Sequence, residues 1–159
     1  MKLVPTHRTD YGLRAMIYLA SADGQRVPAT EIAERMEMPL NFLRQVLREL
    51  RRAHLVTSSP SRNGGYRLAR SASQISVLEI VEALEGSLTD GDCALQGGPC
   101  HWEDVCPLHP IWLSARQAIA EQLARGTLDA VAAEDRAIRE GRVPAPVDSH
   151  RRRPRTERA

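Results

Sequence analysis

The chain has 159 residues, 42% of them hydrophobic, and a formal net charge of +2. This length supports one domain with a real core, and no apolar run approaches the roughly 20 residues that a membrane helix needs. Residues 1–5 hold no apolar stretch of a signal peptide, and three cysteines are an odd number. We therefore expect a reducing, cytoplasmic location and no membrane partner.

The charge is segregated along the chain. Residues 1–70 hold 12 Lys and Arg against 6 Asp and Glu, whereas residues 71–140 hold 4 against 12. Residues 141–159 are basic again, with 6 against 2. A basic first half predicts contact with a polyanion, and an acidic middle predicts contact with protein or solvent.

The first half has the pattern of a helix-turn-helix. Apolar residues recur at helical spacing over residues 9–20, and Asp10 lies where a carboxylate favours the positive end of the helix dipole. Thr30 is predicted to cap a short second helix. A third helix is predicted over residues 40–53, after a break at Pro39. Two short helices at a tight turn are typical of motifs that place the second helix in the major groove.

The exposed face of this third helix is polar and basic. It supplies donors for base edges and for phosphates. Its residues are Asn41, Arg44, Gln45, Arg48, Arg51 and Arg52. The alternative is an ordinary solvated surface.

A basic hairpin is predicted directly after that helix. Leu55–Ser58 and Tyr66–Leu68 have the character of strands, and the Asn63-Gly64 pair between them favours a tight hairpin turn. A hairpin in this place is a wing, and Arg62 at its tip could enter a minor groove. The simpler alternative is that the turn only reverses the chain.

Ser76 and Glu79 form a capping box for a fourth helix, which Gly86 ends. The three cysteines follow at once as C-x6-C-x5-C: Cys93, Cys100 and Cys106. The segment is interrupted by Gly and Pro, so apolar packing explains the cysteines poorly. Thiolates suit zinc, copper(I) or iron-sulfur clusters.

Three thiolates leave such a site one ligand short. A closed zinc or cluster site takes four protein donors, so a fourth would come from His101, His109, a nearby carboxylate or another subunit. The alternatives are a disulfide with one spare thiol, or three free thiols.

A long helix with one apolar stripe is predicted after the cysteines, ending near Gly126. The stripe consists of Leu108, Trp112, Ala115, Ile119 and Leu123. Little chain remains to cover it, so a second copy of the same helix is the expected partner, giving a homodimer. The alternative is packing against its own domain. Residues 127–140 are predicted to form a short helix, and residues 141–159 a disordered basic tail.

Several of these segments resemble the IscR/NsrR family of winged-helix regulators that carry iron-sulfur clusters. Thr9–Ala20 is similar to the opening of the nitric-oxide-sensing NsrR branch, Asn63–Leu68 to the family's wing, and Ser76–Gly86 to the helix before its cluster loop. The resemblance covers roughly residues 1–135. It implies a DNA-binding repressor that responds to nitric oxide or an oxidant.

The resemblance also implies ligands for the cluster. Cys93, Cys100 and Cys106 match the family's three thiolates. In NsrR-like proteins with a 4Fe-4S cluster, an aspartate of the partner subunit completes the site, and Asp10 matches it. In IscR-like proteins with a 2Fe-2S cluster, a histidine three residues after the last cysteine does so, and His109 matches that. We favour Asp10 and a 4Fe-4S cluster.

The predicted DNA contacts lie on the helix-turn-helix and the wing. Arg44 departs from the glutamate found in IscR, so that protein's base preference is not transferred. The set comprises Thr30, Asn41, Phe42, Arg44, Gln45, Arg48, Arg62, Asn63 and Gly64.

Taken together, these patterns predict a mainly α fold with a small β-hairpin wing, that is, a winged helix-turn-helix with a long dimerisation helix. The expected units are residues 1–86 for DNA binding, 87–110 for the cysteine loop, 111–140 for the dimerisation and C-terminal helices, and 141–159 for the tail. An IscR-like sensor of iron or redox status and a zinc-stabilised DNA-binding module remain alternatives. An enzyme is not expected, because no nucleophile-base pair or phosphate-binding glycine loop occurs.

Overall fold

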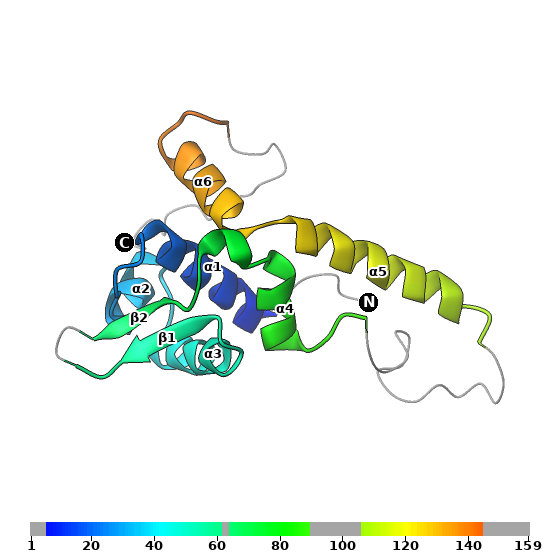
Figure 1. Ribbon diagram of the computed structural model, residues 1–159, viewed down its shortest axis with the longest axis horizontal. Coiled ribbons are helices and arrows are strands. Elements are labelled where there is room, and N and C mark those ends of the chain that lie inside the picture. Colours follow the sequence, from blue (N-terminus) through cyan, green and yellow to red (C-terminus); the bar gives the residue numbers. More distant parts are fainter. Residues whose placement is uncertain (1–5, 62–63, 90–105, 145–159) are drawn as a thin grey trace, which may run out of the picture.

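Residues 6–61, 64–89 and 106–144 are described by the computed structural model of the chain. Within these ranges it has six α-helices, one 3₁₀ turn and one two-stranded hairpin (Figure 1). The elements are α1 (His7–Ser21), α2 (Ala29–Arg35), α3 (Leu40–Arg52), β1 (Val56–Ser59), β2 (Gly65–Leu68), η1 (Ala72–Gln74), α4 (Val77–Glu85), α5 (His109–Arg125) and α6 (Leu128–Arg139). The predicted class, mainly α with a hairpin wing, is confirmed.

The core is built around α1, which contacts α3, α4 and α6. One side of the helix is fully buried, including Ala15, Met16 and Leu19. The helix begins two residues before the predicted start, because the hydroxyl of Thr6 accepts a hydrogen bond from the N–H of Thr9 at 3.4 Å and caps it.

Helices α2 and α3 form the expected helix-turn-helix, but the prediction that Thr30 caps α2 is wrong. Pro28 is the N-cap, with ψ of 143°, and its carbonyl accepts from the N–H of Ile32 at 3.2 Å. Proline preorganises this entry because its φ is fixed. Thr30 is the second residue of the helix, with an exposed side chain.

The wing is fixed to the linker before α2. β1 and β2 pair antiparallel from Val56 opposite Leu68 to Ser59 opposite Gly65. Val27 and Tyr66 then exchange two backbone hydrogen bonds of 2.9 and 2.8 Å. A Cβ on Gly65 would lie 2.5 Å from the carbonyl oxygen of Val27, so only glycine allows this approach.

Helix α4 has both ends that the sequence predicts. The hydroxyl of Ser76 accepts from the N–H of Glu79 at 3.2 Å, and the Glu79 carboxylate accepts from the N–H of Ser76 at 2.9 Å. The helix ends at Gly86, whose φ is +90°. The capping box and the glycine stop are therefore confirmed.

The two C-terminal helices lie on different parts of this body. α5 is anchored at its end, where the N–H of Val77 donates to the carbonyl of Gly126 at 2.8 Å, and its other end extends away from the body (Figure 1). α6 packs on α1, and Leu128 belongs to the main core. No helix in the described ranges is long and apolar enough to cross a membrane.

Candidate nucleic-acid interface and cysteine segment

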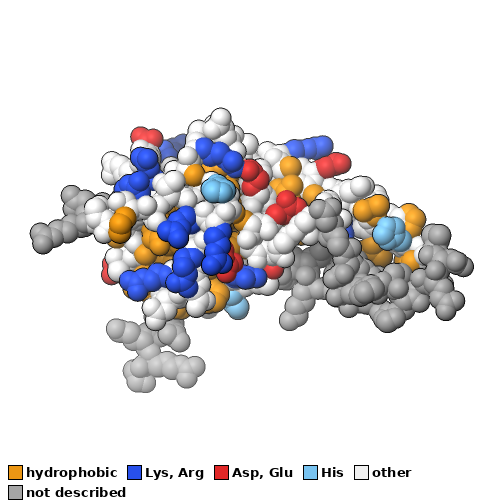
Figure 2. Space-filling view, turned by 60° about the horizontal axis from the view of Figure 1, so that its bottom comes forward, with side chains coloured by type: hydrophobic (Ala, Val, Ile, Leu, Met, Phe, Trp, Pro, Cys, Tyr) orange, Lys and Arg blue, Asp and Glu red, His pale blue; other side chains and the backbone are white. Residues whose placement is uncertain are grey.

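The outer face of α3 carries four of the nine predicted DNA contacts. Leu43, Val46, Leu47 and Leu50 turn their side chains into the core, each 0% exposed. The opposite side chains are therefore held outward, and Asn41, Arg44, Gln45 and Arg48 are all exposed. Figure 2 shows Lys and Arg side chains gathered on one face of the molecule. Such a face attracts the phosphate backbone of DNA.

Phe42 differs from the other predicted contacts on α3. Its ring is half-buried and meets Tyr11 of α1 edge-on, with centroids 5.4 Å apart and planes at 81°. Glu49, on the same side of α3, accepts a hydrogen bond from Arg8 of α1 at 3.3 Å. The helical period of the sequence predicts the buried side of α3. It does not predict that Phe42 and Glu49, on a second side, attach this helix to α1.

The wing residues fall partly inside the described structure. Arg62 and Asn63 lie outside it, whereas Gly64 is half-buried and its N–H donates to the carbonyl of Ser61 at 2.7 Å. A Cβ on Gly64 would lie 2.2 Å from the carbonyl oxygen of Ser59, so glycine is required in this turn. Arg51 of α3 donates to the hydroxyl of Ser58 at 3.2 Å and ties the recognition helix to β1.

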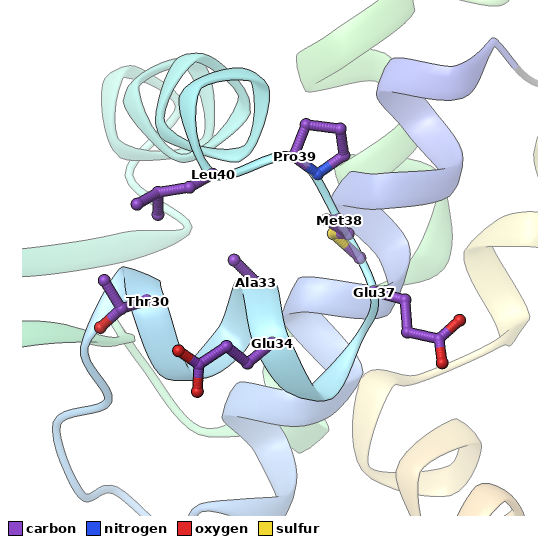
Figure 3. Close-up of a pocket in the computed structure, with 7 residues that line it drawn as sticks. All are labelled: Thr30, Ala33, Glu34, Glu37, Met38, Pro39 and Leu40. Carbon is purple, nitrogen blue, oxygen red and sulfur yellow. The ribbon is translucent and has the colours of Figure 1, made fainter.

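A shallow hollow lies between α2 and the start of α3 (Figure 3). Thr30 lies at one end of it and Glu37 at the other, and Glu34 adds a second carboxylate. Two carboxylates without a basic residue in this lining repel a phosphate. We therefore expect α3, rather than this hollow, to make the main DNA contacts, with Thr30 at the edge of the interface.

Of the predicted thiolates, the structure describes only Cys106, because Cys93 and Cys100 lie outside the described ranges. Cys106 precedes α5 and is 8% exposed. Its carbonyl accepts from the N–H of His109 at 3.0 Å, and the His109 side chain is exposed. Among residues 6–61, 64–89 and 106–144, no three His, Cys, Asp or Glu side chains converge as a metal site.

Asp10, the other proposed fourth ligand, lies in the first turn of α1. Its carboxylate accepts from the Nε atom of Arg14 at 3.0 Å, and its side chain is 41% exposed. It is thus accessible to a second copy of the chain. Binding a metal there would require the carboxylate to be shared with, or released by, Arg14.

Glu85 is a residue that the sequence reasoning missed. It is the last residue of α4, and its carboxylate accepts hydrogen bonds from the N–H of Thr6 at 3.1 Å, from the hydroxyl of Thr6 at 2.5 Å and from the hydroxyl of buried Thr9. A carboxylate at the negative end of a helix dipole is unfavourable without another partner. A glutamate at the predicted end of this helix was therefore the sequence signal that Glu85 has a partner elsewhere.

These contacts join α4 to the start of α1 through a charged group. Partial burial would raise the pKa of Glu85, but the hydrogen bonds from Thr6 and Thr9 outweigh burial and hold that pKa below its ordinary value. A lowered pKa in the folded state means that the carboxylate stabilises the fold above about pH 4.3, and that this contribution is lost as the pH falls through the lowered pKa.

Glu85→Gln is expected to lower the free energy of unfolding by at most about 1 kcal/mol at pH 7, because hydrogen bonds to a charged acceptor become neutral ones and water screens this exposed residue. Urea unfolding at pH 7 and at pH 3.5 measures this. The gap between wild type and variant should narrow at the lower pH, where the wild-type carboxyl gains a proton. Glu34→Gln, a surface change on α2, is the control. A gap of equal size at both pH values would contradict the role of the charge.

Comparison with known proteins agrees with this architecture. Residues 5–134 match the model of the Rrf2 family, described as an iron-dependent transcriptional regulator. The chain is similar to CymR, the global cysteine regulator of B. subtilis, with a TM-score of 0.71 and 28% identity over 84% of this chain and 98% of that one. It is also similar to IscR of T. potens, with a TM-score of 0.70 and 27% identity over 92% and 96%. For CymR of Staphylococcus aureus the TM-score is 0.62, with 31% identity over 80% and 96%.

Proposed function

Because this chain belongs to the Rrf2 family of DNA-binding transcriptional regulators, which are not enzymes, we propose that it is a cytoplasmic, homodimeric repressor controlled by an iron-sulfur cluster. Cys93, Cys100 and Cys106 would hold the cluster, and nitric oxide would be the signal. The expected 4Fe-4S form takes its fourth ligand from Asp10 of a second copy. The alternative 2Fe-2S form takes it from His109.

The donor set fits such a group. Cys106, the one of the three cysteines that the structure describes, is 8% exposed, and a soft sulfur donor shielded from water suits an iron-sulfur cluster. When bound, the cluster supplies an iron centre that reacts with nitric oxide and oxidants. Asp10 and His109 are harder ligands than thiolate, and either would be displaced from its iron more easily than a cysteine.

The contacts of Glu85 with Thr6 and Thr9 are the observation that supports the proposed control of DNA binding. The cysteine segment begins directly after α4, and the last residue of α4 holds the first turn of α1 through Thr6 and Thr9. Next along α1, Tyr11 contacts Phe42 of α3. A displacement of the cysteine segment would therefore reach the recognition helix through packed residues, as a two-state switch requires.

The exposed face of α5 supports the dimer. Of the predicted stripe, Leu108 and Ile119 are 43% and 39% exposed, and the other three members are half-buried. Ile111, beside them on the helix, is 65% exposed. Rrf2 regulators bind DNA and are often dimers. A second copy of α5 would cover this stripe, and two recognition helices would then meet the two halves of a near-palindromic operator.

The test is to purify the full chain without oxygen and to measure iron, sulfide and native mass, with an operator taken from a randomised duplex library for gel shifts. We expect iron and sulfide in every subunit, DNA binding by the loaded protein and release after nitric oxide. Cys106→Ser should lose the iron, and Arg139→Ala, on the far helix α6, should retain it. Protein that holds zinc alone, or that ignores nitric oxide, would contradict the proposal.

The fourth ligand is tested in the same experiment. Asp10→Ala should alter the visible spectrum if the NsrR-like arrangement holds, whereas His109→Ala should do so in the IscR-like arrangement. The Asp10 change also removes the ion pair with Arg14. Arg14→Ala, which breaks that pair and leaves the carboxylate, is the matched control.

A further inference from the structure

The exposed surface of α3 is divided by its contacts. On one side Phe42 and Glu49 contact α1 through Tyr11 and Arg8. On the other side Arg51 donates to Ser58 of the wing. These contacts fix the rotation of α3 about its axis, and they leave one strip of the helix directed away from the body.

Four residues form this strip: Asn41, Gln45, Arg48 and Arg52. At 100° per residue they lie opposite the buried side of the helix, within about 60° of one another. All four side chains are exposed. No hydrogen bond or ion pair engages them within the described part of the chain, so their donors and acceptors are available to a ligand. Arg44 lies to one side of the strip, toward Arg51 and the wing.

We propose that Asn41, Gln45 and Arg48 read base edges, so that each operator half-site presents two adenines and then a guanine in the order in which these residues follow along α3. This rests on the DNA binding proposed above. A side-chain amide pairs with the N6 and N7 atoms of adenine, and a guanidinium pairs with the O6 and N7 atoms of guanine. Two amides followed by one guanidinium therefore match two adenines followed by one guanine.

The spacing suits one half-site. From Asn41 to Arg48 the helix rises about 10 Å, and bases along one strand lie about 3.4 Å apart. The three side chains therefore span about three base steps, or a window of about four base pairs. Arg52 lies one further turn away from the N-terminal end, which is the end that enters the groove most deeply. We assign it to a phosphate.

The experiment selects binding sequences from a randomised duplex library with the full-length protein. Binding is then measured to every single-base variant of the selected half-site, for wild type, Asn41→Ala, Gln45→Ala and Arg48→Lys. Each variant should lose discrimination at one position only, by about tenfold. Arg48→Lys keeps the charge but not the bidentate fork, so its binding to unrelated DNA should remain.

Two further variants separate base reading from simple charge. Arg52→Ala should weaken binding evenly across sequences and reduce the salt slope by about one. Arg139→Ala, on α6, should bind as wild type does. Even weakening by the variants at Asn41, Gln45 and Arg48, or a half-site without the adenines and guanine, would overturn the inference while leaving DNA binding intact. Failure to enrich any sequence would overturn both.

Discussion

Glutamates at positions 111 and 119 of α5 are expected to separate the proposed dimer into monomers. The double variant Ile111→Glu with Ile119→Glu puts two like charges on the exposed apolar surface of each α5, and their burial against a second copy would be unfavourable. With one recognition helix instead of two, affinity for the operator should fall by about 10²- to 10⁴-fold, since the second half-site no longer binds at high effective concentration.

Native mass and gel shift measure the two parts of this prediction. The matched control is Gln117→Glu, an exposed position on the opposite side of α5, which adds charge but should leave the dimer intact. Because Ile111 and Ile119 are 65% and 39% exposed, the fold of each chain should survive, as circular dichroism can check. A double variant that stays dimeric would assign the interface to another surface.

Leu128→Ala is expected to lower the free energy of unfolding by about 2–5 kcal/mol, the usual range for a leucine cut back in a packed core. Leu128 is 1% exposed and belongs to the main core. Its N–H also donates to the carbonyl of Ile75 at 2.8 Å, which fixes where α6 begins. Because this hydrogen bond holds the start of α6 in place, we expect the helix not to shift into the cavity that Leu128→Ala leaves.

Urea unfolding at one fixed protein concentration measures this change, because the stability of a dimer depends on concentration. Glu134→Ala, an exposed position on the same helix, should stay within about 0.5 kcal/mol of wild type. If Leu128→Ala behaved in the same way, α6 would not be part of the cooperative core.

The local features of the fold could be predicted because they depend on neighbours in the chain. The capping box of Ser76 and Glu79 and the stop at Gly86 involve contacts within a few residues. The predicted N-cap of α2 was wrong because a neighbouring residue has the stronger local effect. Thr30 has the right side chain for a cap, but Pro28 fixes the backbone earlier and starts the helix at Ala29.

Only part of the candidate site could be predicted from the sequence. The strip on α3 follows from the helical period, which places Asn41, Gln45 and Arg48 opposite the apolar residues. Glu85 could not be assigned, because its partners Thr6 and Thr9 lie 76 or more residues away in the sequence. Phe42 was predicted to contact DNA, and only the packing of α3 against α1 revealed its contact with Tyr11.

The sequence by itself determined the helices, the wing and the group of three cysteines, because short-range periodicity, turn chemistry and donor type are written in adjacent residues. Tertiary structure alone decided that α6 returns to α1, that α5 leaves Ile111 and Ile119 exposed, and that the end of α4 holds the start of α1. Many pairings of amphipathic faces bury similar apolar area, and the choice among them depends on how side chains of distant segments fit together.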